Sequence, residues 1–120
     1  MADLSDDETQ IVLTEKGKLH AIRFKIDDMQ IAKPKKWDRK WRIVVFDIPE
    51  KRRNARDALR RKLRELDFYE LQKSVFIHPF ECRDEIDFIA EVFQIRPHLR
   101  YGILENITNE AELVKHFKLH

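Results

Sequence analysis

The length, composition and charge of this chain are those of one small domain with a strongly ionic surface. Of its 120 residues, 42% are hydrophobic and 38% are charged, which allows a modest core. With only 2 glycines and 4 prolines, the composition argues against a loop-rich β-sandwich and favours regular helices and strands. A single cysteine cannot form an internal disulfide, and no apolar run could span a bilayer. We therefore expect a soluble, cytoplasmic protein with no membrane partner.

The formal net charge of +2 conceals a strongly basic segment. Residues 33–64 contain 14 lysines and arginines against 4 aspartates and glutamates, whereas the segments before and after are acidic. Such a segment is typical of a surface that binds an anionic polymer. A solvated helix face joined to a basic linker explains the same pattern, and composition leaves both interpretations open.

Residues 1–36 are predicted to form an extension ahead of the main domain. Residues 11–14 give a short strand signal, and a helix is expected from about residue 16 to residue 26. The Lys-Pro-Lys-Lys run at residues 33–36 breaks this pattern. We interpret that run as a connector to a domain of residues 37–120.

The main domain is predicted to begin with a strand over residues 42–48. Its centre, Ile43 to Phe46, is an unbroken apolar run, typical of a strand covered on both faces. Asp47 interrupts the run at its C-terminal end. A carboxylate there must be solvated, paired or bound to a cation, because burying it alone costs several kcal/mol. Pro49 favours the start of a helix directly afterwards.

The helix that follows is predicted over residues 51–67. An apolar face and an adjoining stripe of arginines both repeat at helical spacing. The face consists of Ala55, Leu59, Leu63 and Leu66, and the stripe of Arg53, Arg56, Arg60 and Arg64. Residues 68–79 then carry two short apolar runs with no turn signal strong enough for a tight hairpin. We interpret them as one kinked or bulged strand, or as two strands with different partners.

A second helix is predicted to begin near Asp84, where acidic residues suit the positive end of the helix dipole. One apolar stripe is expected to face the core, and a second stripe predicts a partner surface. Residues 100–107 are predicted to form the last strand, and Asn109 is expected to cap a short helix over residues 110–117. The core stripe consists of Ile86, Ile89, Ala90 and Phe93, and the second stripe of Phe88, Val92 and Ile95.

This order of elements, β-α-β-β-α-β, predicts an α+β fold of the ferredoxin-like type. Such a fold is an antiparallel sheet with both helices on one face. The alternative is a doubly wound nucleotide-binding fold. No G-x-G-x-x-G or G-x-x-x-x-G-K motif follows the first strand, so we reject that alternative.

Basic and aromatic side chains are the first candidates for ligand contacts. The arginine stripe and the connector suit phosphate groups, and binding of this kind weakens steeply with salt. Trp37 and Trp41 either stack on bases or anchor the connector against the sheet, the second being favoured. The five histidines and the single cysteine lack the spacing of a structural zinc site, so none is expected.

Two separated motifs carry a family resemblance. Residues 45–53 read Val-Phe-Asp-Ile-Pro-Glu-Lys-Arg-Arg, and residues 71–76 read Leu-Gln-Lys-Ser-Val-Phe. Together they resemble the small dimeric CRISPR-associated "Cas-two" family and the central domain of PaaX-type repressors of phenylacetate catabolism, which has the same type of fold. The similarity covers residues 37–107. Residues 11–26 resemble the wing and following helix of a winged-helix domain, a remnant that would precede the ferredoxin-like domain.

The resemblance implies a homodimer that binds nucleic acid. It implies that Asp47 is the catalytic residue and the metal ligand, and that both copies of Asp47 share one Mg²⁺ or Mn²⁺ across the dimer interface. The residues alone leave open that Asp47 caps the next helix or pairs with Arg52 or Arg53. Ser74, as the strand serine of the family, would bond a phosphate or the opposing Asp47 across the dimer; the residues alone favour a satisfied strand hydroxyl. The implied nucleic-acid contacts are Lys51, Arg52, Arg53, Arg56, Arg60, Arg64 and Ser74.

Two functions from different classes follow from the resemblance. The first is a role in CRISPR adaptation and antiviral defence, as a magnesium-dependent endonuclease or as a scaffold for the spacer integrase. The second is the dimerisation core of a PaaX-like transcriptional regulator without catalytic activity, sensing an effector of the acyl-CoA type. The wing-like N-terminus favours the regulator, whereas the sequence around Asp47 favours the CRISPR-associated role.

Overall fold

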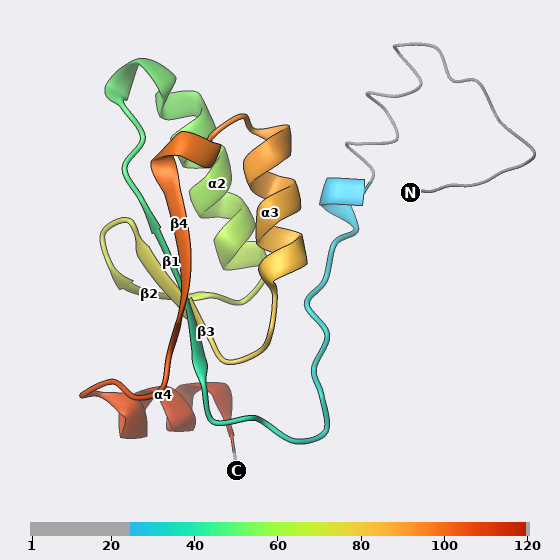
Figure 1. The fold of residues 1–120 in the computed structure, drawn as a ribbon, viewed down its shortest axis with the longest axis vertical. Helices are drawn as coiled ribbons and strands as arrows, with labels where there is room; N and C mark the ends of the chain where they lie inside the picture. Colours follow the sequence, from blue (N-terminus) through green and yellow to red (C-terminus); the bar gives the residue numbers. More distant parts are fainter. Residues whose placement is uncertain (1–24, 120) are drawn as a thin grey trace, which may run out of the picture.

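The computed structural model describes residues 25–119 of the chain (Figure 1). The strand predicted at residues 11–14 and most of the helix predicted to end at residue 26 lie outside this range. Residues 25–27 are helical, and the chain then runs without helix or strand to residue 40. The elements that follow are β1 (Trp41–Phe46), η1 (Glu50–Arg52), α2 (Arg53–Glu65), β2 (Tyr69–Gln72), β3 (Val75–His78), α3 (Arg83–Val92), η2 (Arg96–His98), β4 (Leu99–Leu104) and α4 (Glu110–Phe117).

The four strands form one antiparallel sheet with the order β2-β3-β1-β4. β3 lies between β1 and β2, the arrangement of a split β-α-β unit, and β1 is central with partners on both sides. Figure 1 shows α2 and α3 side by side over one face of this sheet and α4 at its lower end. The predicted ferredoxin-like α+β fold is therefore confirmed. None of the described helices is both long enough and apolar enough to cross a membrane.

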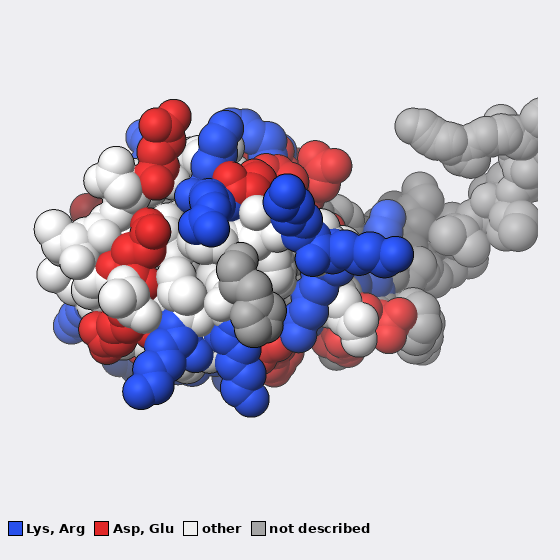
Figure 2. Space-filling model, turned by 90° about the horizontal axis from the view of Figure 1, so that it is seen from below, with Lys and Arg blue, Asp and Glu red and all other residues white. Residues whose placement is uncertain are grey.

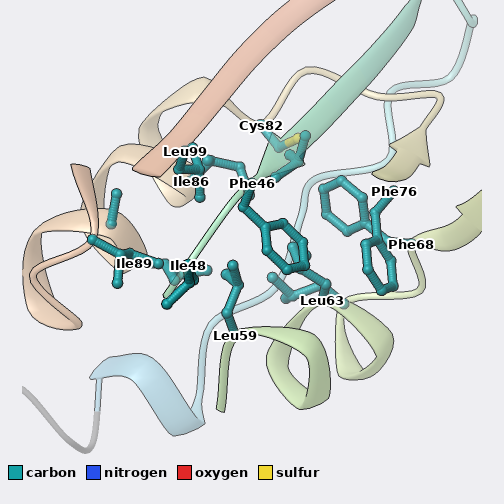
Figure 3. Packing of buried hydrophobic residues seen from close by; sticks show 14 of the residues in the cluster. Phe46, Ile48, Leu59, Leu63, Phe68, Phe76, Cys82, Ile86, Ile89 and Leu99 are labelled. Carbon is teal, nitrogen blue, oxygen red and sulfur yellow. The ribbon is translucent and has the colours of Figure 1, made fainter. Parts of the chain in front are cut away.

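The main core lies between the sheet and the helices α2 and α3 (Figure 3). Strand alternation directs Val44 and Phe46 of β1 to this side, where both are buried. The Phe46 ring stacks on the Phe76 ring of β3, with centroids 5.9 Å apart. The predicted core-facing stripes of both helices are confirmed, because Leu59 and Leu63 of α2 are fully buried, as are Ile86 and Ile89 of α3.

A second cluster lies on the opposite face, where α4 covers the lower end of the sheet. Trp41 is fully buried, and its indole Nε1 donates to Glu110 of α4 at 3.0 Å. Trp37 meets it edge to face at 4.9 Å and donates from Nε1 to the Lys40 carbonyl at 2.9 Å. The tryptophans thus anchor the connector against the sheet, as favoured above. The alternative, that their rings stack on bases, is wrong, because both side chains are buried.

The connection between β2 and β3 is a tight hairpin, contrary to the prediction. Lys73 and Ser74 alone join the two strands, and Ser74 takes a φ of 65°. Glycine or asparagine usually fills such a left-handed position, so the serine concealed the turn. The predicted bulge is present, since the β2–β3 register shifts between Glu70 and Gln72.

Several predicted boundaries also move. β1 ends two residues early, at Phe46, and a short 3₁₀ turn precedes α2. β4 spans Leu99–Leu104 rather than residues 100–107. The final helix has the predicted bounds, although the Asn109 side chain makes no capping hydrogen bond. β1 ends shortly before Pro49, which has no N–H to donate to a neighbouring strand.

The second apolar stripe of α3 was predicted to be an exposed surface for a partner. In the structure it is covered by other parts of the chain. Ile95 is fully buried, and Phe88 and Val92 pack against the main core. The N-terminal segment covers this side of α3, with Ile26 in the same core and the Lys25 ammonium 5.3 Å from the centre of the Phe88 ring. The stripe therefore has a partner within the chain, one that local periodicity could not indicate.

Candidate functional site

The arginine stripe of α2 binds the neighbouring hairpin of its own chain. Arg60 donates to the Ser74 hydroxyl at 3.3 Å, and its guanidinium lies 6.0 Å from the centre of the Phe46 ring. Arg64 donates to Glu70 at 2.9 Å and lies 5.9 Å from the centre of the Phe76 ring. The structure thus brings Arg60 and Ser74 together, in a contact that joins α2 to β2 and to the turn between β2 and β3.

The other predicted nucleic-acid contacts near α2 differ in whether their side chains already have partners within the chain. Arg52 donates to the carbonyls of Phe93, at 2.8 Å, and Gln94, so it closes the C-terminal end of α3. Arg53 and Arg56 both contact Glu50, at 3.4 and 3.2 Å. Lys51 is exposed and makes no side-chain bond within residues 25–119. Of the predicted contacts, Lys51 and Arg53 are therefore the most accessible to a ligand.

Asp47 follows β1 directly and its side chain is exposed. Its backbone N–H donates to the His98 carbonyl at 2.8 Å, which fixes the chain beside β4. The alternatives of a helix cap or an arginine pair are wrong, since η1 has no side-chain cap and Asp47 forms no ion pair in the described part of the chain. Nor does that part contain a group of three His, Cys, Asp or Glu residues able to hold a metal. One carboxylate does not fit Mg²⁺, which prefers octahedral oxygen ligands, so a single protomer does not provide the implied site.

The upper part of the sheet face opposite α2 and α3 is open. Because Val44 and Phe46 point to the helices, Ile43 and Val45 of β1 point away from them. Val75 of β3 is the register partner of Val45 and shares this face. The Val45 side chain is 39% exposed, one of two large hydrophobic side chains classed as exposed in the described range. Ile43, Val45 and Val75 form what we call the open-face patch.

A comparison with known protein families identifies the family of this chain. A family model described as the PaaX protein central Cas2-like domain matches residues 34–114. The chain belongs to this family. A search of curated protein sequences finds no significant match. The matched segment of the PaaX central domain includes Asp47, the arginine stripe, Ser74 and the open-face patch, so the resemblance inferred from the two motifs is confirmed.

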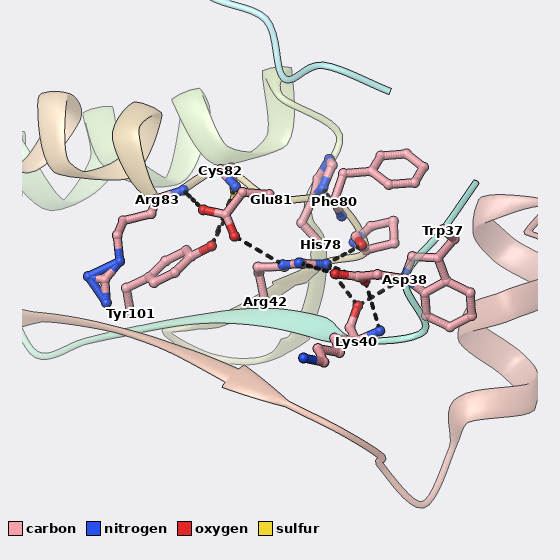
Figure 4. Close-up of polar contacts among 11 residues, drawn as sticks. Trp37, Asp38, Lys40, Arg42, His78, Phe80, Glu81, Cys82, Arg83 and Tyr101 are labelled. Atoms are coloured by element: carbon pink, nitrogen blue, oxygen red, sulfur yellow. Dashed lines mark hydrogen bonds and ion pairs between the residues drawn. The ribbon is translucent and has the colours of Figure 1, made fainter. Parts of the chain in front are cut away.

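A buried arginine of this PaaX-type domain escaped the sequence analysis. Arg42 is 5% exposed and reaches the Asp38 carboxylate with two nitrogens, at 2.5 and 2.9 Å (Figure 4). It also donates to the carbonyl of Pro79 at 2.8 Å, and Glu81 lies 3.6 Å from its Nε. Arg42 thus joins the connector, β1 and the loop after β3. The sequence did contain a sign of this buried arginine, because Arg42 is a charged residue at an inward-facing position of an apolar strand.

The sequence analysis also missed a cavity in this PaaX-type domain. It has a volume of about 690 Å³ and lies between the connector, the end of α2 with the loop to β2, the end of β3 and the end of α4. His78 borders it and is 4% exposed. Burial lowers the pKa of His78 to about 4, and its Nδ1 accepts the Phe80 N–H at 3.1 Å, which requires a neutral ring. No local motif marks this site, because its residues come from four separate parts of the chain.

Proposed function

We propose that this chain is the dimerisation core of a PaaX-type transcriptional regulator, and that a second copy covers the open-face patch. The family membership carries this proposal, because the matched domain holds the fold, both motifs and the patch together. Such a regulator would act on DNA in the cytoplasm. The helix-covered face of the sheet is already filled by α2 and α3, so the opposite face is the one available to a partner.

The open face has the properties of a partly formed interface. α4 buries its lower end, whereas Val45 remains 39% exposed in the upper part. Its register partner on β4 is Arg100, an exposed cation at the rim of the patch. An apolar centre with a charged rim is the usual anatomy of a protein interface. A stable dimer needs roughly 800 Å² from each partner, so contacts beyond the three patch residues must contribute.

The dimer is tested by placing one charge in the patch. We expect Val45→Glu to convert a dimer of this 14.6 kDa chain into a monomer at micromolar concentration, measured by sedimentation velocity. The matched control is Ile103→Glu, because Ile103 is 51% exposed and points to the opposite side of the sheet. Both sites are exposed in the protomer, so neither change should lower the thermal midpoint greatly. An Ile103→Glu monomer beside a Val45→Glu dimer would reverse the assignment of the face.

We also propose that this domain itself binds nucleic acid. The basic segment supports it, and Lys51 and Arg53 are the predicted contacts with the most accessible charge. Arg60 and Arg64 are engaged with Ser74 and Glu70, so a phosphate would have to compete with these partners. We therefore expect the α2 surface to contribute salt-dependent, sequence-independent affinity rather than base recognition.

A metal-dependent endonuclease is the second candidate. It is favoured by one observation: Asp47 is exposed at the end of β1, and strand alternation places it on the same side as Val45. A twofold contact over the open face would then bring two copies of this carboxylate towards one another. The role of scaffold for a spacer integrase rests on the resemblance alone.

The endonuclease is tested with Asp47→Ala in a plasmid-cleavage assay with Mg²⁺ or Mn²⁺. If the second candidate is right, the variant loses all metal-dependent cleavage while its mass by sedimentation stays that of a dimer. Equal cleavage by the variant and the natural chain would remove Asp47 from the reaction. The absence of cleavage by a dimeric natural chain would leave the regulator as the function.

A further inference from the structure

The cavity beside the connector is large enough for a small ligand. Its volume of about 690 Å³ falls within the usual range for ligand sites, which is roughly 300–1,000 Å³. The walls come from the connector, α4 and the residues around His78. Figure 2 views the molecule from the end where α4 and the connector lie, and several Lys and Arg side chains project around this end.

The lining of this cavity is strongly positive. Its lysines at positions 33, 35, 36 and 118, together with Arg64, face a single acidic lining residue, Asp67. Arg64 is paired with Glu70, but none of the four lysines has an ion-pair partner within residues 25–119. Two of the last carbonyls of α4, those of Lys115 and Val114, accept bonds from the Lys118 and Leu119 N–H groups, which reduces the partial negative charge at this helix end. An anionic group is the natural occupant of such a rim.

The inner wall of the cavity is aromatic. His78 lies 5.7 Å from Phe80, 5.9 Å from Phe117 and 4.9 Å from Phe68, measured between ring centroids. Phe80 and Phe117 are half-buried and still offer part of their surface to the cavity. His78 adds no charge to the wall near neutral pH, because burial keeps its ring neutral. The wall therefore suits a planar, weakly polar ring.

We infer that this cavity binds a nucleoside phosphate, with the phosphate at the connector lysines and the base against Phe80 and Phe117. Aromatic faces beside cations are the common means of holding an unpaired base and its phosphate. The ligand is either a free nucleotide or the end of a nucleic-acid strand, and both present the same chemistry. This site is separate from the open-face patch and does not depend on the dimer.

Binding is tested with a fluorescent mononucleotide and a fluorescent single-stranded 12-mer, each titrated with the full chain and followed by anisotropy. We expect the double change Lys35→Glu and Lys36→Glu to weaken binding at least tenfold. The matched control, Arg83→Glu with Arg96→Glu, changes the same number of exposed charges on α3 and η2, away from the cavity and from α2, and should alter the affinity less than threefold. An equal loss in the control would show a diffuse charge effect and overturn the site.

The base is tested separately. Phe80→Leu keeps an apolar side chain at the wall but removes the ring, and we expect about a tenfold loss of mononucleotide affinity in a chain that is still folded at the assay temperature. Inorganic phosphate should compete only at concentrations far above those of the nucleotide. Equal competition by phosphate, or binding of neither probe, would overturn the inference. Binding of the mononucleotide alone identifies a free nucleotide, whereas comparable binding of the 12-mer identifies a strand end.

Discussion

Replacing Asp38 with asparagine is expected to lower the free energy of unfolding by about 2 kcal/mol, although the Asp38 side chain is 48% exposed. An ordinary surface ion pair contributes about 0–1 kcal/mol. Here the partner, Arg42, has a side chain only 6% exposed and cannot regain water when the carboxylate is neutralised. The cost therefore reflects a buried cation that loses its two-point contact rather than a surface pair.

The measurement is urea unfolding of the natural chain, Asp38→Asn and the control Glu81→Gln. Glu81 is 60% exposed and approaches Arg42 only at 3.6 Å, so its neutralisation should cost less than half as much. Arg42 lowers the pKa of the Asp38 carboxyl, so this stabilisation is present above the ordinary pKa of 3.8 and is lost as pH falls through the lower folded value. A change below about 0.5 kcal/mol in Asp38→Asn, which is the usual size for a surface substitution, would contradict this description of the network.

Acidification is expected to destabilise the domain through His78. Burial lowers the pKa of this ring from 6.5 to about 4. Between these values the unfolded chain binds a proton that the folded chain does not, so the free energy of unfolding falls as pH decreases through this window. At about 1.4 kcal/mol per pKa unit, the full loss is on the order of 3 kcal/mol. Protonation would also remove the Nδ1 lone pair that accepts the Phe80 N–H.

The matched variant is His78→Asn, whose amide oxygen can replace Nδ1 as the acceptor but does not titrate. Unfolding free energies of both proteins are compared at pH 7.0 and pH 4.5. The carboxylates titrate in both proteins, so the difference between the two pH dependences isolates His78. We expect the natural chain to lose about 2 kcal/mol more than the variant. Parallel curves would show that His78 is protonated in the folded state without cost.

The fold was predictable because its signals are periodic and local. The helix spacing of Leu59 and Leu63 and the apolar run of β1 each specify an element with its buried side. The hairpin was not predictable, since Ser74 occupies a position that usually requires glycine. The boundaries of β1 and β4 moved because register with a neighbouring strand, which a single sequence does not show, decides where pairing ends.

The site was less predictable than the fold. The arginine stripe was correctly placed on one face of a helix, but the partners of Arg60 and Arg64 lie in the β2–β3 turn and on β2, and helical periodicity does not indicate such contacts. Which face of the sheet is open to a partner near Asp47 depends on the arrangement of the strands and helices. That arrangement is seen only in the folded sheet. The cavity near His78 requires α4 to return beside the connector, and no local pattern indicates that contact.

The central claim is that a second copy of the chain covers the open-face patch. A photoreactive benzophenone amino acid at position 45, compared with the same amino acid at position 103, tests it most directly. We predict a covalent dimer, twice the 14.6 kDa chain mass, from position 45 on irradiation and only monomer from position 103. Cross-linking from position 103 alone, or from neither position at concentrations where nucleic acid binds, would contradict the account.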